Sequence, residues 1–459
     1  MLDVIVIGGG ISGLTTAWRA MEAGLEVCLL ESSSRSGGVI GSLQRPEGLL
    51  ELGPDSLLVG RPSVRTLLED LNLLEQAVSP LPSRPWMGRR GHLYPLPEGF
   101  RSVAPTRLLP FVRTPLLSWW GKFRMLWDLV LPASPLTDQT LSQLIGRRFG
   151  REALEQLAQP LIGGIYAADP DRLSLAATMP HLLALEKEHG SLIRGLWKSS
   201  AAPPKMSSLP EGLGQLTNTL ARNLGNRIQT SCPVRGLQKV GDHWQLEAQD
   251  QTFQARQVVV ATGAHHCTDL LSHLDSNLAC LIRGIVCRDI GIVNLLYRAD
   301  QVGDLPPGCQ GFLLPLKENS IFSAASLTQQ KWPDRIQPSV INFRLHLGGA
   351  GRESFLSLDD ETLLHRAAAE LTSWVPVEGR PLYRLLTRHP RAMPEYRQGH
   401  LELIRRVESH LEGMPGLHLV GNWLSGVGIS ECVARAEGLL PRLTEFARSH
   451  SRGPSSSRV

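Results

Sequence analysis

The chain has 459 residues, of which 42% are hydrophobic and 20% are charged, a composition typical of a folded globular protein with two to three domains. Its net charge of +4 comes from 47 Lys and Arg against 43 Asp and Glu, too small an excess to favour nucleic-acid binding. The 7 cysteines are odd in number and form no Cys-x-x-Cys pair, so we expect neither a disulfide framework nor a metal site.

The first residues are already strand-like, with no basic segment ahead of an apolar one, so no targeting peptide is expected. No run of about 18 apolar residues is present, so no transmembrane helix is expected either. With the cysteine pattern, this predicts a reducing location on the cytoplasmic side. Residues 449–459 are rich in Ser and Arg and are predicted to form a disordered tail.

In chain order, residues 2–7 predict a buried strand, residues 11–23 a helix and residues 25–30 a second strand. A further helix is predicted over residues 62–74, where leucines recur at helical spacing. From residue 85 to 205 prolines recur between short apolar and helical segments. This change of character favours a separate, mostly helical insertion.

The α/β pattern returns near residue 207 and continues to the last helix. Further helices are predicted at 211–224, 359–374 and 429–447. Strands are predicted at 228–230, 244–248, 253–255, 258–261 and 417–420, with more alternating strands within 283–346.

Gly8, Gly10 and Gly13 form a Gly-x-Gly-x-x-Gly motif between the first strand and the first helix. Such glycines permit a tight turn, a close approach of the backbone to a pyrophosphate, and close helix–strand packing. The helix N-terminus then offers N–H groups and partial positive charge to phosphates. Glu31, about 20 residues further on, can accept both hydroxyls of an adenosine ribose and would repel a 2′-phosphate.

Three further segments favour FAD over NAD. Arg35-Ser36-Gly37-Gly38 is a second glycine-rich turn, which suits a cofactor that continues beyond the pyrophosphate, and Glu51-Leu52-Gly53-Pro54 is another small-residue approach. Near the end of the chain, Gly421-Asn422-Trp423 and Gly426-Val427-Gly428 precede a helix. Its N-terminus could lie under the N1/C2=O edge of a flavin; the alternative is an ordinary strand-to-helix turn.

Together these motifs resemble the flavin-containing amine oxidase superfamily, and longer segments are similar to its oxygen-dependent protoporphyrinogen oxidases. The similar segments are Glu51–Ser56, Phe149-Gly150 with Pro160–Pro170 and Leu173-Ser174, Leu185-Glu186 with Gly190–Ile193, and Gly421–Trp423 with Gly426-Val427 and Cys432-Val433. They keep their order over nearly the whole chain. The segment from Pro160 to Pro170 is the most discriminating, because amine oxidases and desaturases do not carry it as such.

We therefore expect a mixed α/β fold with α+β character. A discontinuous, Rossmann-like FAD domain would combine residues 1–75, 207–270 and 400–448. A substrate domain built on a mixed β-sheet would span residues 271–399. The helical insertion would span residues 85–205.

The resemblance implies FAD-dependent oxidation of protoporphyrinogen IX by O₂, giving protoporphyrin IX and H₂O₂, as a step of haem or chlorophyll biosynthesis. The implied FAD contacts are Gly8, Gly9, Gly10, Ile11, Ser12, Gly13, Glu31, Ser32, Arg35, Gly38, Val39, Gly53, Pro54, Asp55, Ser56, Val234, Asn422, Val427, Gly428 and Ile429. The implied substrate contacts are Arg84, Gly163, Gly164, Leu313, Leu314 and Trp332.

Some of these residues have simpler readings. Arg84 would anchor a propionate bidentately, or lie in a solvated loop. The glycine pair 163–164 would line the porphyrinogen cavity, or only break a helix. Trp332 would form a cavity wall, or pack in the core, since an insertion precedes it relative to the family.

No residue is assigned as catalytic. Hydride leaves a methylene bridge readily because the cation is delocalised into the pyrroles, so the main need is to place that bridge about 3–3.5 Å from flavin N5. His265-His266 is interpreted as a loop near the FAD domain. The segment 105–135, rich in Trp and Phe beside basic residues, either lies on a membrane surface or packs within the protein.

Other functions remain open. The chain could oxidise coproporphyrinogen III instead, or be an amine oxidase or a carotenoid desaturase of the same superfamily. It could also bind FAD or a porphyrin without catalysis. A homodimer is compatible with the sequence but not indicated by it.

Overall fold

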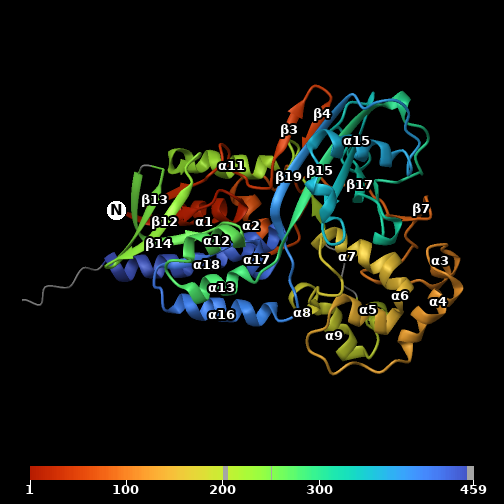
Figure 1. The fold of residues 1–459 in the computed structure, drawn as a ribbon, viewed down its shortest axis with the longest axis horizontal. Helices are drawn as coiled ribbons and strands as arrows, with labels where there is room; N and C mark the ends of the chain where they lie inside the picture. Colours follow the sequence, from red (N-terminus) through yellow and green to blue (C-terminus); the bar gives the residue numbers. More distant parts are fainter. Residues whose placement is uncertain (200–204, 250, 452–459) are drawn as a thin grey trace, which may run out of the picture.

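The structure is a computed structural model that describes residues 1–199, 205–249 and 251–451. Figure 1 shows two lobes: the N-terminus and one β-sheet with its helices lie in one, and the other combines a second sheet with a cluster of helices below it. We call the first lobe the dinucleotide unit, the second sheet the substrate sheet, and residues 108–198 the helical region. The prediction of a mixed α/β fold with a Rossmann-like domain is confirmed.

The sheet of the dinucleotide unit draws its strands from three separate parts of the chain. Their order is β11-β2-β1-β14-β13-β12, with β20 also pairing β14. The strands are β1 (Leu2–Ile7), β2 (Val27–Leu30), β11 (Ile228–Gln229), β12 (Val234–Val240), β13 (His243–Ala248), β14 (Gln251–Val260) and β20 (Leu417–Leu419). β1 is parallel to β2 and β14, and β14 is parallel to β20. The two short strands predicted within 253–261 are one long strand, β14.

Helices cover both faces of this sheet, because successive residues of β1 point to opposite sides. Val4 and Val6 pack on one side against α1 (Ile11–Glu22), α2 (Pro62–Asp70), α11 (Gly214–Leu224) and α18 (Ile429–Ser451). Ile5 and Ile7 pack on the other against α12 (Ala264–Leu271), α13 (Ser276–Arg283), α16 (His400–Glu412) and α17 (Asn422–Ser425).

Two sequence predictions need correction here. His265 and His266 lie on helix α12, not in a loop. The helix α18 extends to Ser451, so the first residues of the predicted tail are helical, and residues 452–459 lie outside the described residues.

The substrate sheet is mixed and has the order β19-β15-β18-β17-β16-β6-β7. Its strands are β6 (Trp86–Arg89), β7 (His92–Pro95), β15 (Cys287–Arg298), β16 (Gly311–Leu313), β17 (Phe322–Leu327), β18 (Val340–Gly348) and β19 (Tyr383–Pro394). β6 runs parallel to β16, while the other neighbours are antiparallel. Helix α15 (Asp360–Leu371) covers one face through Leu363, Ala367 and Leu371, and α14 (Thr328–Lys331) follows β17.

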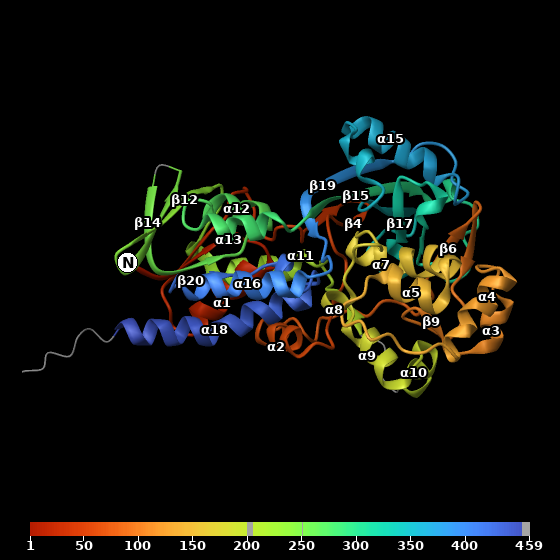
Figure 2. The ribbon, with the colours of Figure 1, turned by 60° about the horizontal axis from the view of Figure 1, so that its bottom comes forward.

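The helical region lies below the substrate sheet in both views (Figures 1 and 2). It consists of α3 (Leu108–Arg113), α4 (Trp119–Leu126), the 3₁₀ turn η1 (Trp127–Leu129), α5 (Leu141–Phe149), α6 (Arg151–Ala153), the π-helical turn η2 (Leu154–Ala158), α7 (Gln159–Tyr166), α8 (Leu175–Thr178), α9 (Pro180–His189) and α10 (Leu192–Lys198). The mostly helical character predicted for residues 85–205 therefore begins only after β6 and β7, which extend the substrate sheet.

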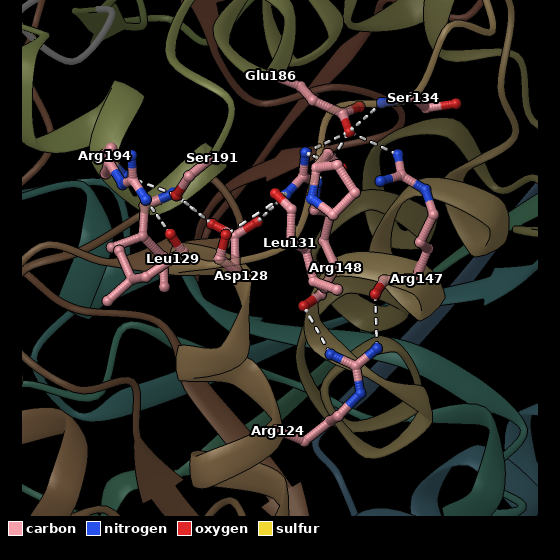
Figure 3. A network of polar contacts seen from close by, with 12 residues as sticks. Arg124, Asp128, Leu129, Leu131, Ser134, Arg147, Arg148, Glu186, Ser191 and Arg194 are labelled. Carbon is pink, nitrogen blue, oxygen red and sulfur yellow. Dashed lines mark hydrogen bonds and ion pairs between the residues drawn. The ribbon is translucent and has the colours of Figure 1, made fainter.

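A buried ion network holds the helical region together (Figure 3). The guanidinium of Arg148 on α5 lies 2.6 Å from the Glu186 carboxylate on α9 and 3.2 Å from the Asp128 carboxylate in η1. Asp128 also accepts hydrogen bonds from the Ser191 hydroxyl and the Ile193 N–H at the start of α10. One arginine thus connects the segments around α5, η1 and α9.

Short elements connect the larger ones. They are the paired strands β3 (Ser42–Arg45) and β4 (Gly48–Glu51), β5 (Leu57–Leu58) and β10 (Met206–Ser207), and β8 (Phe100–Arg101) and β9 (Ala104–Pro105), with the 3₁₀ turns η3 (Gly225–Arg227), η4 (Ala299–Gln301), η5 (Leu316–Glu318) and η6 (Glu353–Ser357). Among the described helices, none has both the length and the hydropathy needed to cross a membrane.

Candidate functional site

The glycine-rich turn between β1 and α1 has the backbone geometry that its motif predicts. Gly8 has φ = +106°, and a Cβ atom added there would lie 2.9 Å from the Ala261 carbonyl oxygen. A Cβ atom on Gly13 would lie 1.9 Å from the Gly8 carbonyl oxygen, so any other residue would push α1 off β1. Around Gly10, in contrast, no described atom comes within 4 Å of an added Cβ atom, so the turn is open on that side.

This opening faces the N-terminus of α1. Gly10 is the N-cap, and none of the described side chains caps the helix. The first intrahelical bond of this turn runs from the Leu14 N–H to the Gly10 carbonyl, so the N–H groups of residues 11–13 precede the hydrogen-bonded ladder. Such a helix terminus is suited to bind a phosphate. Two buried hydroxyls, those of Thr15 and Thr262, have no hydrogen-bond partner among the described residues, and Thr262 adjoins Gly8.

Glu31 lies beside this turn, but its carboxylate is already partly engaged. Its Oε2 accepts the Gly9 N–H at 2.6 Å, and its Oε1 accepts the Ser33 N–H at 2.7 Å and the Ser33 hydroxyl at 2.6 Å. A carboxylate offers about four acceptor positions, so Oε2 keeps capacity for a ribose hydroxyl. The Cys232 N–H donates to the Glu31 carbonyl, which places the start of β12, and so Val234, at this end.

The loop from Arg35 to Val39 lies against the glycine turn. The Gly37 N–H donates to the Gly9 carbonyl at 2.7 Å, and a Cβ atom on Gly38 would lie 3.1 Å from the Gly10 Cα atom. The Arg35 guanidinium donates to the carbonyls of Ser36, Gly38 and Ile40, so it shapes the loop from within. Val39 is apolar but 41% exposed, as expected for a residue that faces a ligand.

Residues 51–56 continue the site beyond this loop. A Cβ atom on Gly53 would lie 1.8 Å from the Val39 carbonyl oxygen, so only glycine fits there. The Asp55 carboxylate lies 2.8 Å from the Lys331 ammonium and 3.4 Å from the Arg344 guanidinium. Burial alone would raise the pKa of Asp55, but the two cations outweigh it and hold that pKa well below its usual range. The Asp55 side chain thus pairs with Lys331 and Arg344 of the substrate-sheet region, and its contact with FAD stays a prediction.

Trp332 differs from its predicted place in a cavity wall. Its indole is only 1% exposed, and its N–H donates to Asp55 at 3.3 Å. The ammonium of Lys331 and the guanidinium of Arg335 lie 5.1 and 4.9 Å from its ring centroid. The residue is therefore a core tryptophan in this structure, which was the alternative reading of its sequence context.

The C-terminal loop closes the far end of the site. The Trp423 N–H donates to the Thr262 carbonyl at 3.0 Å, and Thr262 adjoins Gly8. The Cys432 thiol on α18 contacts the Ser12 hydroxyl on α1, so the two helices begin side by side. Residues 427–429, expected at the flavin edge, are half-buried there. Contacts between neighbouring loops therefore connect Glu31, the glycine turn, residues 35–39, residues 53–56 and the start of α18 into one elongated site.

The predicted substrate residues approach this end from the helical region. Gly163 and Gly164 lie on α7, and a Cβ atom on Gly164 would lie 3.4 Å from Leu313. Tyr166, at the end of the same helix, has its pKa raised by burial and by the nearby Glu431 carboxylate in the first turn of α18. Its neighbour Ile165 is 61% exposed although apolar. The residues predicted to hold the substrate thus lie beside those predicted to hold the flavin.

The chamber expected beside these glycines is nearly closed in this structure. Gly163, Gly164 and Leu314 line a cavity of only about 10 Å³. A larger cavity of about 650 Å³ lies on the other side of Gln159, between α5–α7 and η5. Arg84 is exposed just before β6, so both of its predicted readings, propionate anchor and solvated loop, stay open.

Sequence reasoning missed several polar residues of this site. Lys331 and Arg344 flank Asp55, and His389 on β19 contacts the Leu52 carbonyl at 2.8 Å beside Gly53. Burial first of all lowers the pKa of His389, so its imidazole is neutral near pH 7. Tyr396 and His400 contact the loop before α18. Lone polar residues of this kind carry no local motif, and only the fold brings them to the site.

Comparisons with known proteins agree with this geometry. The family described as "Flavin containing amine oxidoreductase" matches residues 11–437. A Bacillus subtilis (strain 168) protein named "Coproporphyrinogen III oxidase" is 30% identical over 94% of this chain and 95% of its own length. The Nicotiana tabacum protein named "Protoporphyrinogen oxidase, chloroplastic" is 26% identical over 97% of this chain and 86% of its own length.

Solved structures show the same fold. A crystal structure from Exiguobacterium sp. 255-15, which carries a provisional protoporphyrinogen oxidase name, superposes with a TM-score of 0.88 at 27% identity and covers 97% of this chain and 99% of its own. Reduced UDP-galactopyranose mutase superposes with a TM-score of 0.72 at 14% identity, covering 98% of each chain, a likeness of fold alone.

Proposed function

Because the chain belongs to the family of flavin containing amine oxidoreductases and its cofactor is FAD, we propose that it oxidises a porphyrinogen to the corresponding porphyrin with O₂ as the electron acceptor. The observation that carries this proposal is the approach of α7 to the flavin end of the site. Tyr166 lies near Glu431 there, and the preceding Gly163 and Gly164 present no side chain toward Leu313, although the cavity that they line is only about 10 Å³ in this structure. Relatives named for two porphyrinogens align over nearly the whole chain.

Bound FAD supplies a two-electron acceptor for the hydride that leaves a methylene bridge. The chain's part is to hold that cofactor and to orient the substrate. The N–H groups of residues 11–13 would hold the pyrophosphate, and Glu31 would hold the ribose. No strong base is required, because the pyrrole N–H protons can leave to water or to a backbone carbonyl. In balance, one porphyrinogen and three O₂ give one porphyrin and three H₂O₂ by three two-electron steps.

For the substrate itself we place coproporphyrinogen III ahead of protoporphyrinogen IX, the substrate expected from the sequence. The support is the name shared by curated relatives at 30% and 27% identity, from Bacillus subtilis and Staphylococcus aureus. Coproporphyrinogen III carries four propionates, protoporphyrinogen IX only two. An exposed guanidinium such as that of Arg84 is suited to bind such a carboxylate.

The test is to follow porphyrin fluorescence and H₂O₂ in air with each porphyrinogen and the FAD-loaded protein. We expect a kcat/KM at least about tenfold higher for coproporphyrinogen III, equivalent to about 1.4 kcal/mol. A higher value for protoporphyrinogen IX would reverse the substrate order within the same reaction. A protein whose FAD is reduced by dithionite and reoxidised by air, yet which oxidises neither porphyrinogen, would contradict the proposal.

Arg84 gives a sharper test of substrate binding. Arg84→Ala should raise KM about tenfold with little change in kcat, because a propionate contact is made equally in the bound and reacting states. Arg65→Ala is the matched control, since Arg65 is also exposed and pairs only locally with Glu69 on α2. Equal KM values for the two variants would indicate that Arg84 lies in a solvated loop and does not bind the substrate.

We also propose that the protein contacts a membrane on the cytoplasmic side through the helical region. Large apolar side chains are exposed along α3, α4 and η1, at the end of the molecule remote from the dinucleotide unit (Figures 1 and 2). We call them the aromatic ridge: Leu108, Leu109, Val112, Trp119, Trp120, Phe123, Trp127 and Val130. Trp119 and Trp120 are 73% and 80% exposed, and the rings of Trp120, Phe123 and Trp127 contact one another edge to face.

Charge favours an anionic lipid surface as the partner of the ridge. Residues 98–130 contain five cations, Arg101, Arg107, Arg113, Lys122 and Arg124, against two acids, Glu98 and Asp128. Asp128 and Lys122 are both buried, so the outward balance is four arginines against Glu98 and remains positive. Aromatic rings beside basic groups are typical of interfacial helices.

Flotation with vesicles of phosphatidylcholine and phosphatidylglycerol tests this contact. We expect the protein to float with the anionic vesicles, and the double variant Trp119→Ser, Trp120→Ser to stay behind. Leu382→Ser is the matched control. Leu382 is 52% exposed and directly precedes β19, an edge strand of the substrate sheet outside the aromatic ridge. Wild-type protein that stays in the aqueous phase would contradict the proposal. So would a dimer that the double variant abolishes, since the ridge would then bind a second copy.

A further inference from the structure

Two aromatic side chains fasten the loop that precedes α18. Tyr396 follows β19 and is 1% exposed; its hydroxyl donates to the Asn422 carbonyl and accepts the Gly426 N–H at 2.6 Å. The imidazole of His400, at the start of α16, stacks on the Tyr396 ring with centroids 4.0 Å apart and planes at 11°. Its Nε2 lies 3.1 Å from the Leu424 carbonyl. Three backbone groups of one short loop are therefore held by two side chains.

The protonation states of both residues suit these contacts. Burial raises the pKa of Tyr396 well above its usual range, so the hydroxyl keeps its proton and can donate. Burial lowers the pKa of His400, so its ring is neutral and carries the proton on Nε2 to donate to the Leu424 carbonyl. Neither contact depends on a charge.

The loop they hold has little regular structure of its own. It contains the single helical turn α17, flanked by Gly421 with φ = +151° and Gly426 with φ = +137°. Such glycines leave the chain conformationally free, so outside contacts must define its path. The loop ends directly at residues 427–429, the start of α18. Any shift of the loop therefore moves this helix terminus.

The same segment also contacts the helical region. The Tyr396 carbonyl accepts the Ser174 N–H at 2.8 Å, and the Glu395 carboxylate accepts the Asp169 N–H at 2.9 Å. Asp169 lies in the most discriminating family segment, Pro160–Pro170, just after α7, and Ser174 follows that segment. Residues 395–400 thus lie between the helix that approaches the substrate and the loop that precedes α18.

We propose that Tyr396 and His400 are positioning residues that fix the N-terminus of α18 against the flavin and thereby set its reduction potential. The proposal rests on FAD binding and not on the identity of the substrate. A helix N-terminus carries about half a positive charge, which stabilises a reduced, anionic flavin more than an oxidised one. Loosening the loop lets this terminus recede, so the reduced form should lose part of its stabilisation.

The experiment uses the FAD-loaded protein without any porphyrinogen. Tyr396→Phe removes the hydroxyl but keeps the ring, and His400→Phe removes the N–H donor but keeps the stacking. For each variant we expect the equilibrium constant for flavin reduction to fall about tenfold. For a two-electron couple this corresponds to a midpoint potential lower by about 30 mV. The visible spectrum of the flavin should also change. The double variant should be no worse than the more affected single one, because both act on one loop.

Two controls separate positioning from general stability. Tyr297→Phe alters another tyrosine that is 1% exposed, on β15 of the substrate sheet, and should leave the potential unchanged. His400→Gln keeps a side-chain donor near the Leu424 carbonyl and should restore most of the potential. Wild-type potentials in both Phe variants, even with lower melting temperatures, would overturn the proposal. So would flavin loss in Tyr396→Phe combined with a wild-type potential in His400→Phe. Because no porphyrinogen is used, failure here is distinct from failure of the proposed function.

Discussion

The dinucleotide unit and the helical region differ in what they add to a buried apolar core. In the dinucleotide unit, Val4, Ile5 and Val6 are fully buried, and the backbone N–H groups at the start of α1 are left open toward a ligand. In the helical region the guanidinium of Arg148 has no exposed surface, whereas the indole of Trp120 is 80% exposed. Both regions bury an apolar core, but the dinucleotide unit offers backbone groups to a ligand, whereas the helical region also buries paired ions and exposes apolar rings.

This contrast indicates that the two regions fail for different reasons. The glycine turn depends on close steric contact, so one added methyl group is enough to disturb it. The helical region depends on the pairing of buried ions, where removing one partner leaves the others uncompensated. Each expectation below tests one side of this contrast, from the largest effect to the smallest.

The largest effect is expected at the glycine turn. Gly13→Ala would place its Cβ atom 1.9 Å from the Gly8 carbonyl oxygen, so the variant should lose FAD and much of its folded protein. Gly10→Ala meets no described atom within 4 Å, so it should fold normally and yet bind FAD weakly, because its methyl group occupies the expected pyrophosphate position. Flavin content measures FAD binding by the two variants, and circular dichroism measures how much of each is folded. A flavin-loaded Gly13→Ala protein would contradict the steric argument.

The second largest effect is expected on the stability of the helical region. Arg148→Met removes the cation between Asp128 and Glu186 and should cost about 3–5 kcal/mol of unfolding free energy, since the buried Asp128 carboxylate loses this cation and Glu186 keeps only Arg147. Arg151→Ala breaks only an exposed pair with Glu155 and should leave the melting temperature unchanged. Urea unfolding, with flavin release followed in parallel, distinguishes the regions. Simultaneous loss of FAD in Arg148→Met would show that they do not unfold separately.

The same contrast explains how much the sequence could predict. The strand, glycine turn and helix at residues 2–23 are local features, and they were predicted nearly residue by residue. Strand β19 was not predicted, because its arginines, histidine and proline hide the alternation of an edge strand. The long-range contacts between Asp55 and Arg344, or between Tyr396 and residues 422–426, depend on topology. No local pattern encodes them.

As the pH falls, we expect the dinucleotide unit to lose stability before the helical region does. Burial, above all, lowers the pKa of His265 and His418 to about 4, so both stay neutral in the folded protein. Unfolded histidines gain a proton below about pH 6.5, so the stability these residues contribute is present above that pH and lost as pH falls toward 4. For Glu186, burial favours a raised pKa, but hydrogen bonds from Arg147 and Arg148 outweigh it and lower the pKa. Its contribution is lost only below about pH 4.5.

Melting temperatures between pH 7.5 and 5 check this order. His418→Gln should reduce the pH dependence in that range, because glutamine does not titrate and can keep the contact with Gln257. His181→Gln on α9 gives the comparison in the helical region: burial also lowers the pKa of His181, but less than that of His418, so its effect on the pH dependence should be smaller. If both variants reduced the pH dependence of the melting temperature equally, the two regions would not differ in their sensitivity to acid.

The smallest effect is expected on the aromatic ridge. Trp120→Ser should change the unfolding free energy by less than about 0.5 kcal/mol, since a side chain that is 80% exposed gains little from folding. Trp423→Ser, at a tryptophan with no exposed surface, should by comparison be severely destabilising. Denaturant titration of the two variants measures the difference. A marked loss in Trp120→Ser would mean that the ridge packs within the protein.

The adjacent starts of α1 and α18 have a consequence for biosynthesis. Residues 11–13 leave the ribosome early, whereas residues 427–429 emerge only after almost all of the remaining chain. Because both helix starts are predicted to contact FAD, we expect flavin capture to be a late event that follows synthesis of almost the whole chain. Chains that stall before the last helix should stay colourless, so the yellow of bound flavin reports that assembly of both ends is complete.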